Sequence, residues 1–437
     1  MSTGKMKILV VMVLVILNIV AVAKLVGVMS SETNENKELE TALSTARDYK
    51  KQNLCNAALQ YYRKSLEKKD RLEIRKEMTE TYDKGLENGE VGSQKVIDDF
   101  LLATVDERWK DAATYEFALD YFQKQNNEEM LVAVVNRATE NRISSETIKK
   151  YYNELSRKCS ISDARFSSVR YSDNSWFCVS DGLKYGYVNQ NGETVADFQY
   201  DYATPFFDGY ALLKNGDYTY LADTDFVRWR YMNDSISSSS GFGNGIVSGA
   251  EEGKYIYYFA GDKKSEEYDY AGKFQNGIAA VKKGEQWSLL NSEGKEISKN
   301  SYKEIAVNNR EECVNNGVIF VKDEKWHILN TELEVIADLD CEEVDIAPNG
   351  ELFAFKKNGK WGFADYQGNV KISPQYEDAR AFSYGYGGAK KNGKWGFVDK
   401  DNIFQMEGEY EDVLYFTDSK TCFVKVDGLW TIISKLL

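Results

Sequence analysis

The chain has one histidine, His327, on which most nucleophilic or metal chemistry would have to be built. A Ser-His-Asp or Cys-His system would need this residue, yet His327 directly follows Trp326 in a strand-like segment, and its neighbours suggest no such system. A single histidine also excludes metal sites with two histidine ligands. No glycine-rich phosphate loop is present. The sequence therefore offers no catalytic, cofactor-binding or metal-binding residue, and we expect His327 to be structural.

The six cysteines do not form a recognisable site either. No Cys-x-x-Cys pair supports a zinc or redox centre, and six cysteines over 437 residues are too sparse for a disulfide scaffold. We predict buried free thiols, with one or two isolated disulfides as the alternative. The positions are Cys55, Cys159, Cys178, Cys313, Cys341 and Cys422.

Acidic residues are abundant, and the net charge of −14 argues against nucleic acid as a partner. Paired carboxylates for glycoside hydrolysis stay open, because 69 acids offer many candidates. Several acids, however, follow a recurring tyrosine: Asp201, Glu377-Asp378 and Glu411-Asp412. Because they recur, we predict that they accept backbone N–H groups in turns rather than form a catalytic pair.

These acids belong to a repeat. Lys356-Lys357-Asn358-Gly359-Lys360-Trp361-Gly362-Phe363 returns almost unchanged 34 residues later, and such a period indicates a repeat architecture. Each unit is expected to contain a strand, an Asn-Gly turn, a second strand, a glycine turn and a third strand that ends at the tyrosine and acid. Eight aromatic anchors define the units: Tyr185, Tyr218, Tyr255, Trp287, Trp326, Trp361, Trp395 and Trp430.

The repeated segment resembles the WG-repeat family over residues 163–437. The resemblance is carried by Gly359-Lys360-Trp361-Gly362-Phe363, by the matching Gly393-Lys394-Trp395-Gly396-Phe397, and by Tyr185-Gly186-Tyr187. The other five units keep the aromatic residue and lose the glycine. The resemblance implies a β-rich domain that is widespread in bacteria and has no common enzymatic activity.

The units are predicted to close into an eight-unit β-propeller, with a linear solenoid as the alternative. The eighth unit stops soon after Trp430, and Asp163-Ala164-Arg165-Phe166, compared with Asp378-Ala379-Arg380-Ala381-Phe382, supplies its missing segment. Trp361 and Trp395 should face the core, next to glycines that permit close backbone approach. A long flexible loop is predicted at residues 235–245, and a specific site is expected there or on the loops of divergent units.

Residues 34–158 are predicted to be helical, because apolar residues recur there at spacings of three and four. The expected caps include Ser93, Asn127 and Ser144. Residues 39–68 resemble one tetratricopeptide-type helical hairpin, although its consensus Trp, Gly and Pro are missing. The region serves either as a spacer or as a groove for a peptide.

Residues 8–29 are predicted to form a transmembrane anchor, because this apolar run is long enough to cross a bilayer. Lys5 and Lys7 precede it, so residues 1–7 should remain cytoplasmic and the bulk of the chain should lie outside. The alternative is a cleaved signal peptide that ends near Ala21-Val22-Ala23. Both alternatives export the remainder.

The predicted fold class is α+β and multidomain: a transmembrane helix, a solenoid-like helical region and an all-β repeat domain. The predicted function is that of a non-enzymatic binding or scaffolding protein of the cell membrane. Its partner is expected to be an unknown protein or cell-wall glycan, with the membrane contacted through the amino-terminal helix. Two alternatives remain open, namely a propeller-type glycan hydrolase and an envelope sensor or assembly factor that acts through the helical region.

Overall fold

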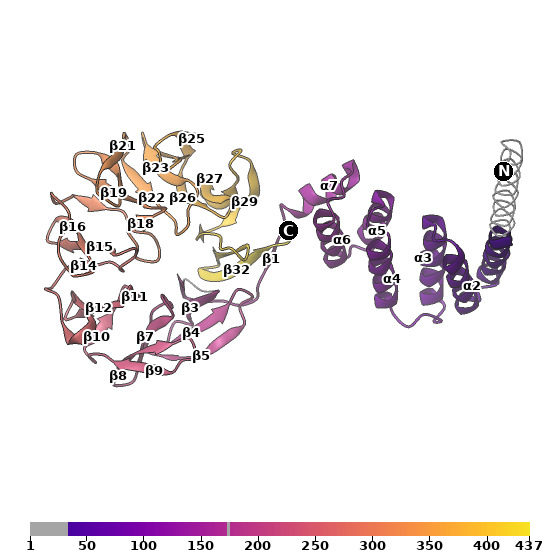
Figure 1. Ribbon diagram of the computed structural model, residues 1–437, viewed down its shortest axis with the longest axis horizontal. Coiled ribbons are helices and arrows are strands. Elements are labelled where there is room, and N and C mark those ends of the chain that lie inside the picture. The colour runs from indigo at the N-terminus through magenta and orange to yellow at the C-terminus, as the bar shows by residue number, and fades with distance from the viewer. Residues whose placement is uncertain (1–33, 173–174) are drawn as a thin grey trace, which may run out of the picture. The chain divides into compact units, whose positions relative to one another are not determined.

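The computed structural model describes residues 34–172 and 175–437 (Figure 1). The chain divides after Leu155 into a helical unit and a β unit, Ser156–Leu436. The two units are described separately below. The first β strand begins at Cys159, before the predicted start of the repeat domain at residue 163.

The helical unit is a row of helices in which each packs on the next. Contacts also join α4 to α6 and α5 to α7, so alternate helices are neighbours, as in stacked helical hairpins. Asn127 caps α6 by accepting a hydrogen bond from Met130 N, whereas α7 is capped by Ser145 rather than by Ser144. Residues 34–51 are helical, followed by α2 (Cys55–Lys68), α3 (Leu72–Glu87), α4 (Gln94–Glu107), α5 (Ala112–Lys124), α6 (Glu128–Glu140) and α7 (Glu146–Leu155).

The predicted fold class needs one correction, which concerns the membrane. In residues 34–172 and 175–437, no helix is long and apolar enough to cross a bilayer. The predicted anchor, residues 8–29, lies outside the described residues. The fold class is therefore a helical unit joined to an all-β repeat domain, without a transmembrane helix among its described elements.

The β unit is an eight-bladed propeller, as predicted, and its strands form eight sheets in the described part of Ser156–Leu436. Blade 1 contains β2 (Ser168–Tyr171), β3 (Trp176–Ser180), β4 (Tyr185–Asn189) and β5 (Thr194–Tyr200), and blade 2 contains β6 (Tyr202–Ala203), β7 (Tyr210–Asn215), β8 (Tyr218–Asp223) and β9 (Arg228–Tyr231). Blade 3 contains β10 (Ile236–Ser238), β11 (Phe242–Gly243), β12 (Ile246–Glu251) and β13 (Lys254–Tyr258). Blade 4 contains β14 (Tyr270–Ala271), β15 (Ile278–Lys283) and β16 (Gln286–Asn291).

The second half of the ring continues the same pattern (Figure 1). Blade 5 contains β17 (Glu304–Ile305), β18 (Val314–Asn315), β19 (Val318–Lys322), β20 (Trp326–Asn330) and β21 (Val335–Leu339). Blade 6 contains β22 (Glu343–Asp345), β23 (Phe353–Lys357), β24 (Lys360–Ala364) and β25 (Val370–Tyr376), and blade 7 contains β26 (Asp378–Ser383), β27 (Tyr386–Lys391), β28 (Lys394–Val398) and β29 (Phe404–Tyr410). Blade 8 contains β30 (Asp412–Val413), β31 (Thr421–Val426), β32 (Leu429–Lys435) and β1 (Cys159–Ile161).

The typical blade has one strand more than the three-stranded unit predicted from the repeat. The residues that follow each tyrosine and acid form a short innermost strand of the next blade, for example β26 after Tyr376. Each blade then runs outward in chain order, as in β26-β27-β28-β29. The repeat boundary chosen from the aromatic anchors thus divides one blade between two units.

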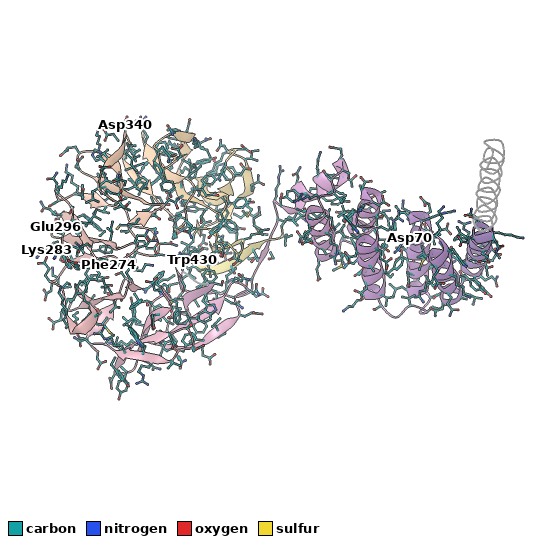
Figure 2. All side chains as sticks on the ribbon, viewed as in Figure 1. Asp70, Phe274, Lys283, Glu296, Asp340 and Trp430 are labelled. Carbon is teal, nitrogen blue, oxygen red and sulfur yellow. The ribbon has the colours of Figure 1, made fainter. Side chains whose placement is uncertain are left out.

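Strand β1 closes the ring by pairing with β32, which contains Trp430 (Figures 1 and 2). Phe166 then bridges Trp430, just as Tyr376 pairs with Trp361 and Tyr410 with Trp395. The closure is therefore as predicted, but the register differs. Phe166 takes the place of the repeat tyrosine. Arg170, not Arg165, corresponds to Arg380, because Arg170 lies opposite the third residue of β3 and Arg380 lies opposite the third residue of β27.

Apolar side chains fill the spaces between neighbouring blades (Figure 2). One cluster joins Tyr171 and Phe177 of the first blade to Phe423 and Ile432 of the last, so the closing gap is packed like the others. Trp361 and Trp395 are buried, as predicted. Because a blade cannot bury its own two faces, these layers between blades hold the ring together.

The glycine of the Trp-Gly pair is explained by a bulge in the outermost strand. In blade 6, Trp361 pairs with Tyr376 and Phe363 pairs with Ile372, so four residues of β25 span two of β24. A Cβ atom on Gly362 would lie 2.5 Å from the Ile372 carbonyl oxygen. Blades 1 and 7 show the same bulge and the same glycine.

Blade 5 shows what happens when the glycine is missing. Here His327 follows Trp326, and the outer strand pairs residue by residue from Trp326 to Ile328, with Leu339 opposite Trp326 and Asp338 opposite His327. The tyrosine of the repeat lies fifteen residues after its anchor, whereas Leu339 lies thirteen after Trp326. The outer strand of blade 5 therefore lacks the two extra residues of the bulge, and this leaves room for the His327 side chain where other blades have glycine.

Two further expectations can now be compared with the structure. Residues 235–245 do not form a flexible loop, because β10 and β11 make them the innermost strand of blade 3. Ser240 is buried there and donates to the Ala271 carbonyl oxygen of blade 4 at 2.5 Å. All six cysteines are free, as predicted, and four are buried. Burial raises the pKa of the Cys178 and Cys313 thiols to about 12.

Candidate functional site

The repeated acids lie at one face of the propeller, where they join neighbouring blades. Glu377 accepts hydrogen bonds from the Asn392 and Gly393 amides of the next blade, both at 2.9 Å. Asp201 and Glu411 accept in the same way from the Asn-Gly-type turn that follows each of them. These acids accept hydrogen bonds from turn amides, as predicted, and their carboxylates therefore serve the structure of the propeller.

His327 also has an architectural environment. Its Nδ1 lies 2.7 Å from Asp338 Oδ1 and its Nε2 lies 3.0 Å from Asp323 Oδ1. The hydrogen bond with His327 lowers the pKa of Asp323 to about 2. Both ring nitrogens thus form hydrogen bonds with aspartates, and neither of these bonds involves a serine or a cysteine. Through the bond to Asp338, His327 holds the third and outer strands of blade 5 together.

The opposite face carries the turns that join each innermost strand to the next strand. In blades 2 to 5 these turns are alike: Asp208-Gly209, Asn244-Gly245, Asn276-Gly277 and Asn316-Gly317, all with positive φ. Two of their side chains bind the next turn, since Asp208 accepts from Asn244 N at 2.7 Å and Asn244 accepts from Gly277 N at 2.9 Å. Here too the repeated residues serve the fold.

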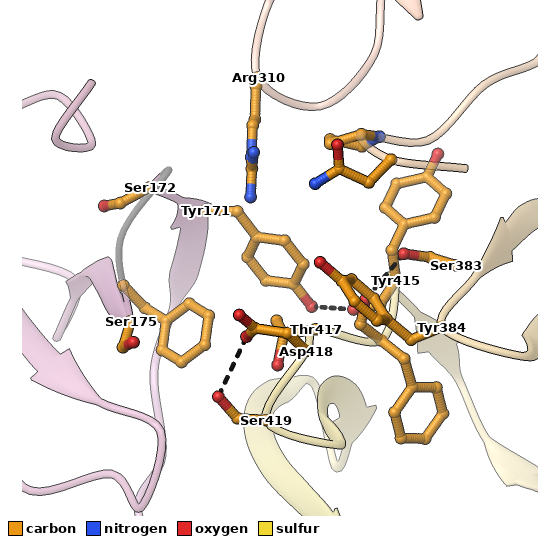
Figure 3. Close-up of a pocket in the computed structure, with 14 residues that line it drawn as sticks. Tyr171, Ser172, Ser175, Arg310, Ser383, Tyr384, Tyr415, Thr417, Asp418 and Ser419 are labelled. Atoms are coloured by element: carbon orange, nitrogen blue, oxygen red, sulfur yellow. Dashed lines mark hydrogen bonds between the residues drawn. The ribbon is translucent and has the colours of Figure 1, made fainter. Parts of the chain in front are cut away.

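The pair differs in the next three blades: Gly350 after Asn349 has no positive φ in blade 6, Tyr384 precedes the glycine in blade 7, and Ser419-Lys420 forms the turn in blade 8. A cavity of about 160 Å³ is lined by these blades together with blades 5 and 1. Figure 3 shows Arg310 reaching toward Tyr171, between the segment with Ser172 and Ser175 and the segment with Tyr384 and Tyr415. We refer to this cavity as the axial pocket. Its described lining comes from five consecutive blades, from blade 5 to blade 1.

Five polar side chains of the lining form what we call the rim: Ser175, Arg310, Asn349, Tyr384 and Asp418. Each comes from a different blade, and no two are the same residue type. Tyr384 is 43% exposed and has a φ of 48°, at the position where blades 2 to 5 have Asn or Asp. A bulky residue in this conformation costs about 1 kcal/mol, so the fold alone does not favour it.

The floor of the axial pocket is fixed by buried hydrogen bonds. The Tyr171 hydroxyl donates to the Tyr415 carbonyl oxygen at 2.7 Å, and the Tyr415 hydroxyl donates to Asp345 at 2.8 Å. Burial raises the pKa of Asp345, although the charge of Arg380 and the Ala381 amide oppose the shift. Burial also raises the pKa of Tyr171 and Tyr415 well above the usual range. These phenols remain neutral and form a rigid base.

Arg310 belongs to an insertion in blade 5, residues 306–313, which no other blade matches in length. The insertion is held by a buried ion pair in which Lys273 Nζ lies 2.5 Å from Glu312 Oε1, and both side chains are 5% exposed. Asn308 donates to the other Glu312 oxygen at 2.9 Å. This anchoring places Arg310 at the pocket while its own Nε is buried and has no hydrogen-bond partner among the described residues.

Sequence reasoning named no residue of the axial pocket, although a signal for one was present. The longest spacing between anchors, 39 residues from Trp287 to Trp326, marks the insertion that carries Arg310. Tyr384-Gly385 likewise replaces the Asn-Gly or Asp-Gly pair of other blades. The expectation that a site lies on loops of divergent units therefore points to the right class of residue, but the favoured stretch, residues 235–245, is structural.

A second exposed feature is strand β9 of blade 2, Arg228–Tyr231. Trp229 and Tyr231 are more than half exposed, and the Arg228 guanidinium lies 4.7 Å from the centre of the Tyr231 ring. This is the outer edge of its sheet. Arginine and aromatic residues are common in interfaces, but they also occur singly on free surfaces.

Comparisons with solved structures find propeller-like chains at low identity. Hsv2p of Kluyveromyces lactis is 9% identical, with a TM-score of 0.34, covering 60% of this chain and 92% of that chain. The Pan2 WD40 domain of Neurospora crassa is 9% identical, with a TM-score of 0.32 and coverages of 62% and 89%. PorZ of Porphyromonas gingivalis is 10% identical, with a TM-score of 0.32 and coverages of 53% and 36%. At these scores the likeness carries no argument.

The sequence comparisons are narrower. No curated protein matches the chain. The family model of the WG containing repeat matches residues 185–218, 266–287 and 361–395, which include the pairs Tyr185-Gly186 of blade 1 and Trp361-Gly362 of blade 6 and end at Trp395 of blade 7. These three stretches of the propeller are therefore similar to the WG containing repeat.

Proposed function

We propose that the protein is a non-enzymatic binding or scaffolding protein whose propeller holds a partner at the axial pocket. The observation that carries the proposal is the rim, where five blades each contribute a different polar residue, Arg310 from an insertion and Tyr384 from a turn that elsewhere has Asn or Asp. A concave site with a few convergent polar groups is the usual form of a binding site. The partner is an envelope protein or a cell-wall glycan.

The hydrolase alternative makes a more specific demand on the same pocket. Glycoside hydrolysis requires two carboxyl groups that flank the scissile bond. Among the described lining residues, Asp418 alone has a carboxyl group. Asp345 lies behind Tyr415, whose single hydroxyl proton is shared between the two Asp345 oxygens at 2.8 and 3.0 Å, and Asp345 also accepts from Ala381 N. Those residues suit binding better than hydrolysis.

The proposal includes a location outside the cytoplasm. Its support is the sequence of the first 29 residues, in which Lys5 and Lys7 precede a long apolar run. Export of residues 34–437 follows whether or not this segment is later removed. Protease added to intact cells should degrade the propeller, and full protection in intact cells with digestion after lysis would place the protein in the cytoplasm instead.

The binding proposal is tested by capturing partners from a cell-envelope extract with the full chain. The informative variant is Tyr384→Asn, because it restores the Asn-Gly turn of the other blades and so preserves the fold while it removes a rim residue. Tyr218→Asn is the matched control, since Tyr218 is 59% exposed on another part of the propeller.

We expect the wild type and Tyr218→Asn to enrich the same protein or glycan and Tyr384→Asn to lose it. Circular dichroism and thermal melting show whether each variant remains folded. Equal enrichment by all three chains would reject the axial pocket as the binding site, and enrichment by none would reject the proposed function.

A further inference from the structure

The charge of the axial pocket indicates what it binds. We propose that the pocket accepts the carboxylate group of a small polar ligand, with Arg310 as the anchor. This inference rests on the proposed function, because it assigns a ligand class to the same site. Three properties of the pocket support it: the unpaired Nε of Arg310, the charges of the lining residues and the volume of the cavity.

The guanidinium of Arg310 has unused hydrogen-bonding capacity. Its Nε is buried without a partner among the described residues, although buried polar atoms are normally paired. Two nearby residues share this state, namely Asn309 of the same insertion through Oδ1 and Asn315 of strand β18 through Nδ2. An unpaired buried donor costs free energy, and an acceptor that enters the pocket would remove that cost. Arginine presents its N–H groups in a fork that matches a carboxylate.

The number of charges favours a ligand with a single negative charge. Arg310 is the only cationic side chain among the described residues that line the pocket, and Asp418 adds a negative charge to the same lining. The chain as a whole has a net charge of −14. With Arg310 and Asp418 in one lining, a bound carboxylate adds one uncompensated negative charge and a phosphate dianion adds two, so the ligand with the smaller charge is favoured.

The remaining rim residues suit hydroxyl or amino groups on the same ligand. The Asn349 amide both donates and accepts, Ser175 has a hydroxyl, and Asp418 accepts only. Tyr384 offers a ring face next to them. A cavity of about 160 Å³ admits a ligand about as large as one sugar ring or one small amino acid, rather than a long peptide. Sugar acids and free amino acids are thus the two sources of this carboxylate.

The experiment measures binding to the full chain by isothermal titration calorimetry, with four probes: D-glucuronate, D-glucose, L-alanine and inorganic phosphate. Glucuronate and glucose differ mainly in the carboxylate, so their ratio isolates the contribution of Arg310. We expect at least one carboxylate probe to bind about 10- to 100-fold more tightly than glucose, which is the effect of charge-assisted hydrogen bonds. The preference between glucuronate and alanine identifies the source.

Three variants locate the effect. Arg310→Gln should weaken the carboxylate probe about 10- to 100-fold and leave the weak binding of glucose unchanged. Arg310→Lys should retain part of the affinity, because the charge stays and the fork is lost. Lys420→Gln is the control, since Lys420 is an exposed cation on the blade 8 turn that does not line the pocket.

Several results would overturn the inference. These are equal affinity for glucose and glucuronate, tighter binding of phosphate than of either carboxylate, no carboxylate binding at all, or an equal loss in Lys420→Gln and Arg310→Gln. The outcome is separable from that of the proposed function. A partner that is captured through Tyr384 while every carboxylate fails would keep the proposed function and reject this ligand class.

Discussion

Replacing Gly362 by alanine should destabilise the propeller, because the glycine lies under the bulge of strand β25. A Cβ atom at this position would lie 2.5 Å from Ile372 O, 2.7 Å from Pro374 N and 2.9 Å from Ser373 C. All three are backbone atoms, which cannot move aside by a change of rotamer. Only a shift of the outer strand can relieve the contacts, at the expense of its pairing with β24.

The expected magnitude follows from the behaviour of overpacked cores, in which added methyl groups cost about 1–3 kcal/mol. We expect about 2–3 kcal/mol here, because the obstruction is entirely backbone. For a domain of this size, each kcal/mol lowers the Tm by about 2 °C, so the shift should be about 4–6 °C. The matched control is Gly92→Ala, since nothing lies within 4 Å of a Cβ atom on Gly92.

Tryptophan fluorescence during thermal unfolding is a suitable assay, because every tryptophan except Trp109 lies in the propeller. Deleting Ser373 and Pro374 provides a second arm. The deletion leaves one residue between Ile372 and Tyr376, as Asp338 lies alone between Ala337 and Leu339 in blade 5. In that background, glycine and alanine at position 362 should be nearly equal. A neutral Gly362→Ala in the full-length chain would refute the bulge explanation.

Three other changes test parts of the fold. Glu377→Ala should cost about 1 kcal/mol in chemical denaturation, because two turn amides lose their acceptor, whereas Glu409→Ala should be near neutral; equal effects would contradict this role. Glu312→Gln should cost about 3–5 kcal/mol because the buried Lys273 ammonium loses the carboxylate that balances its charge, and adding Lys273→Met should recover part of the loss; strictly additive losses would argue against the pair. The depressed pKa of Asp323, about 2 in the folded protein, implies stability that is present above its ordinary pKa of 3.8 and is lost as the pH falls toward 2. The difference in unfolding free energy between wild type and Asp323→Asn should therefore be present at pH 5 and disappear toward pH 2; a difference independent of pH would exclude this linkage.

The sequence predicts the propeller because its signals are local and repeated. The turn Asn358-Gly359, the apolar residues two apart and the tyrosine fifteen residues on are all read within one unit, and eight copies fix the fold. Ring closure was also predictable, since the last unit lacks a strand. The sequence does not predict the innermost strands, because they are two to six residues long. They also follow the tyrosine and acid, which indicate the end of a repeat unit.

The axial pocket could not be predicted in the same way. Ser175 and Asp418 line the same cavity because β1 closes the ring, although they are far apart in the sequence. The serine-rich stretch at residues 235–245 looked like a loop, but its hydroxyl groups satisfy backbone groups of blades 3 and 4, as in the bonds of Ser239 to Ser248 O and of Ser240 to Ala271 O. Polar composition alone does not distinguish a solvated loop from a strand whose hydroxyls are paired internally.

The two faces of the propeller differ in what the repeat leaves available. On one face the Asn-Gly turns and the acids after each tyrosine are consumed by bonds between blades, as Glu377 shows. On the other face, Asp208 and Asn244 are consumed in the same way. The described rim residues come instead from segments that depart from the repeat, such as the insertion with Arg310 and the turn with Tyr384. It follows that a propeller with the same Trp-Gly units but other residues on the rim would keep this fold and bind a different ligand, so the motif that identifies the repeat does not determine its specificity.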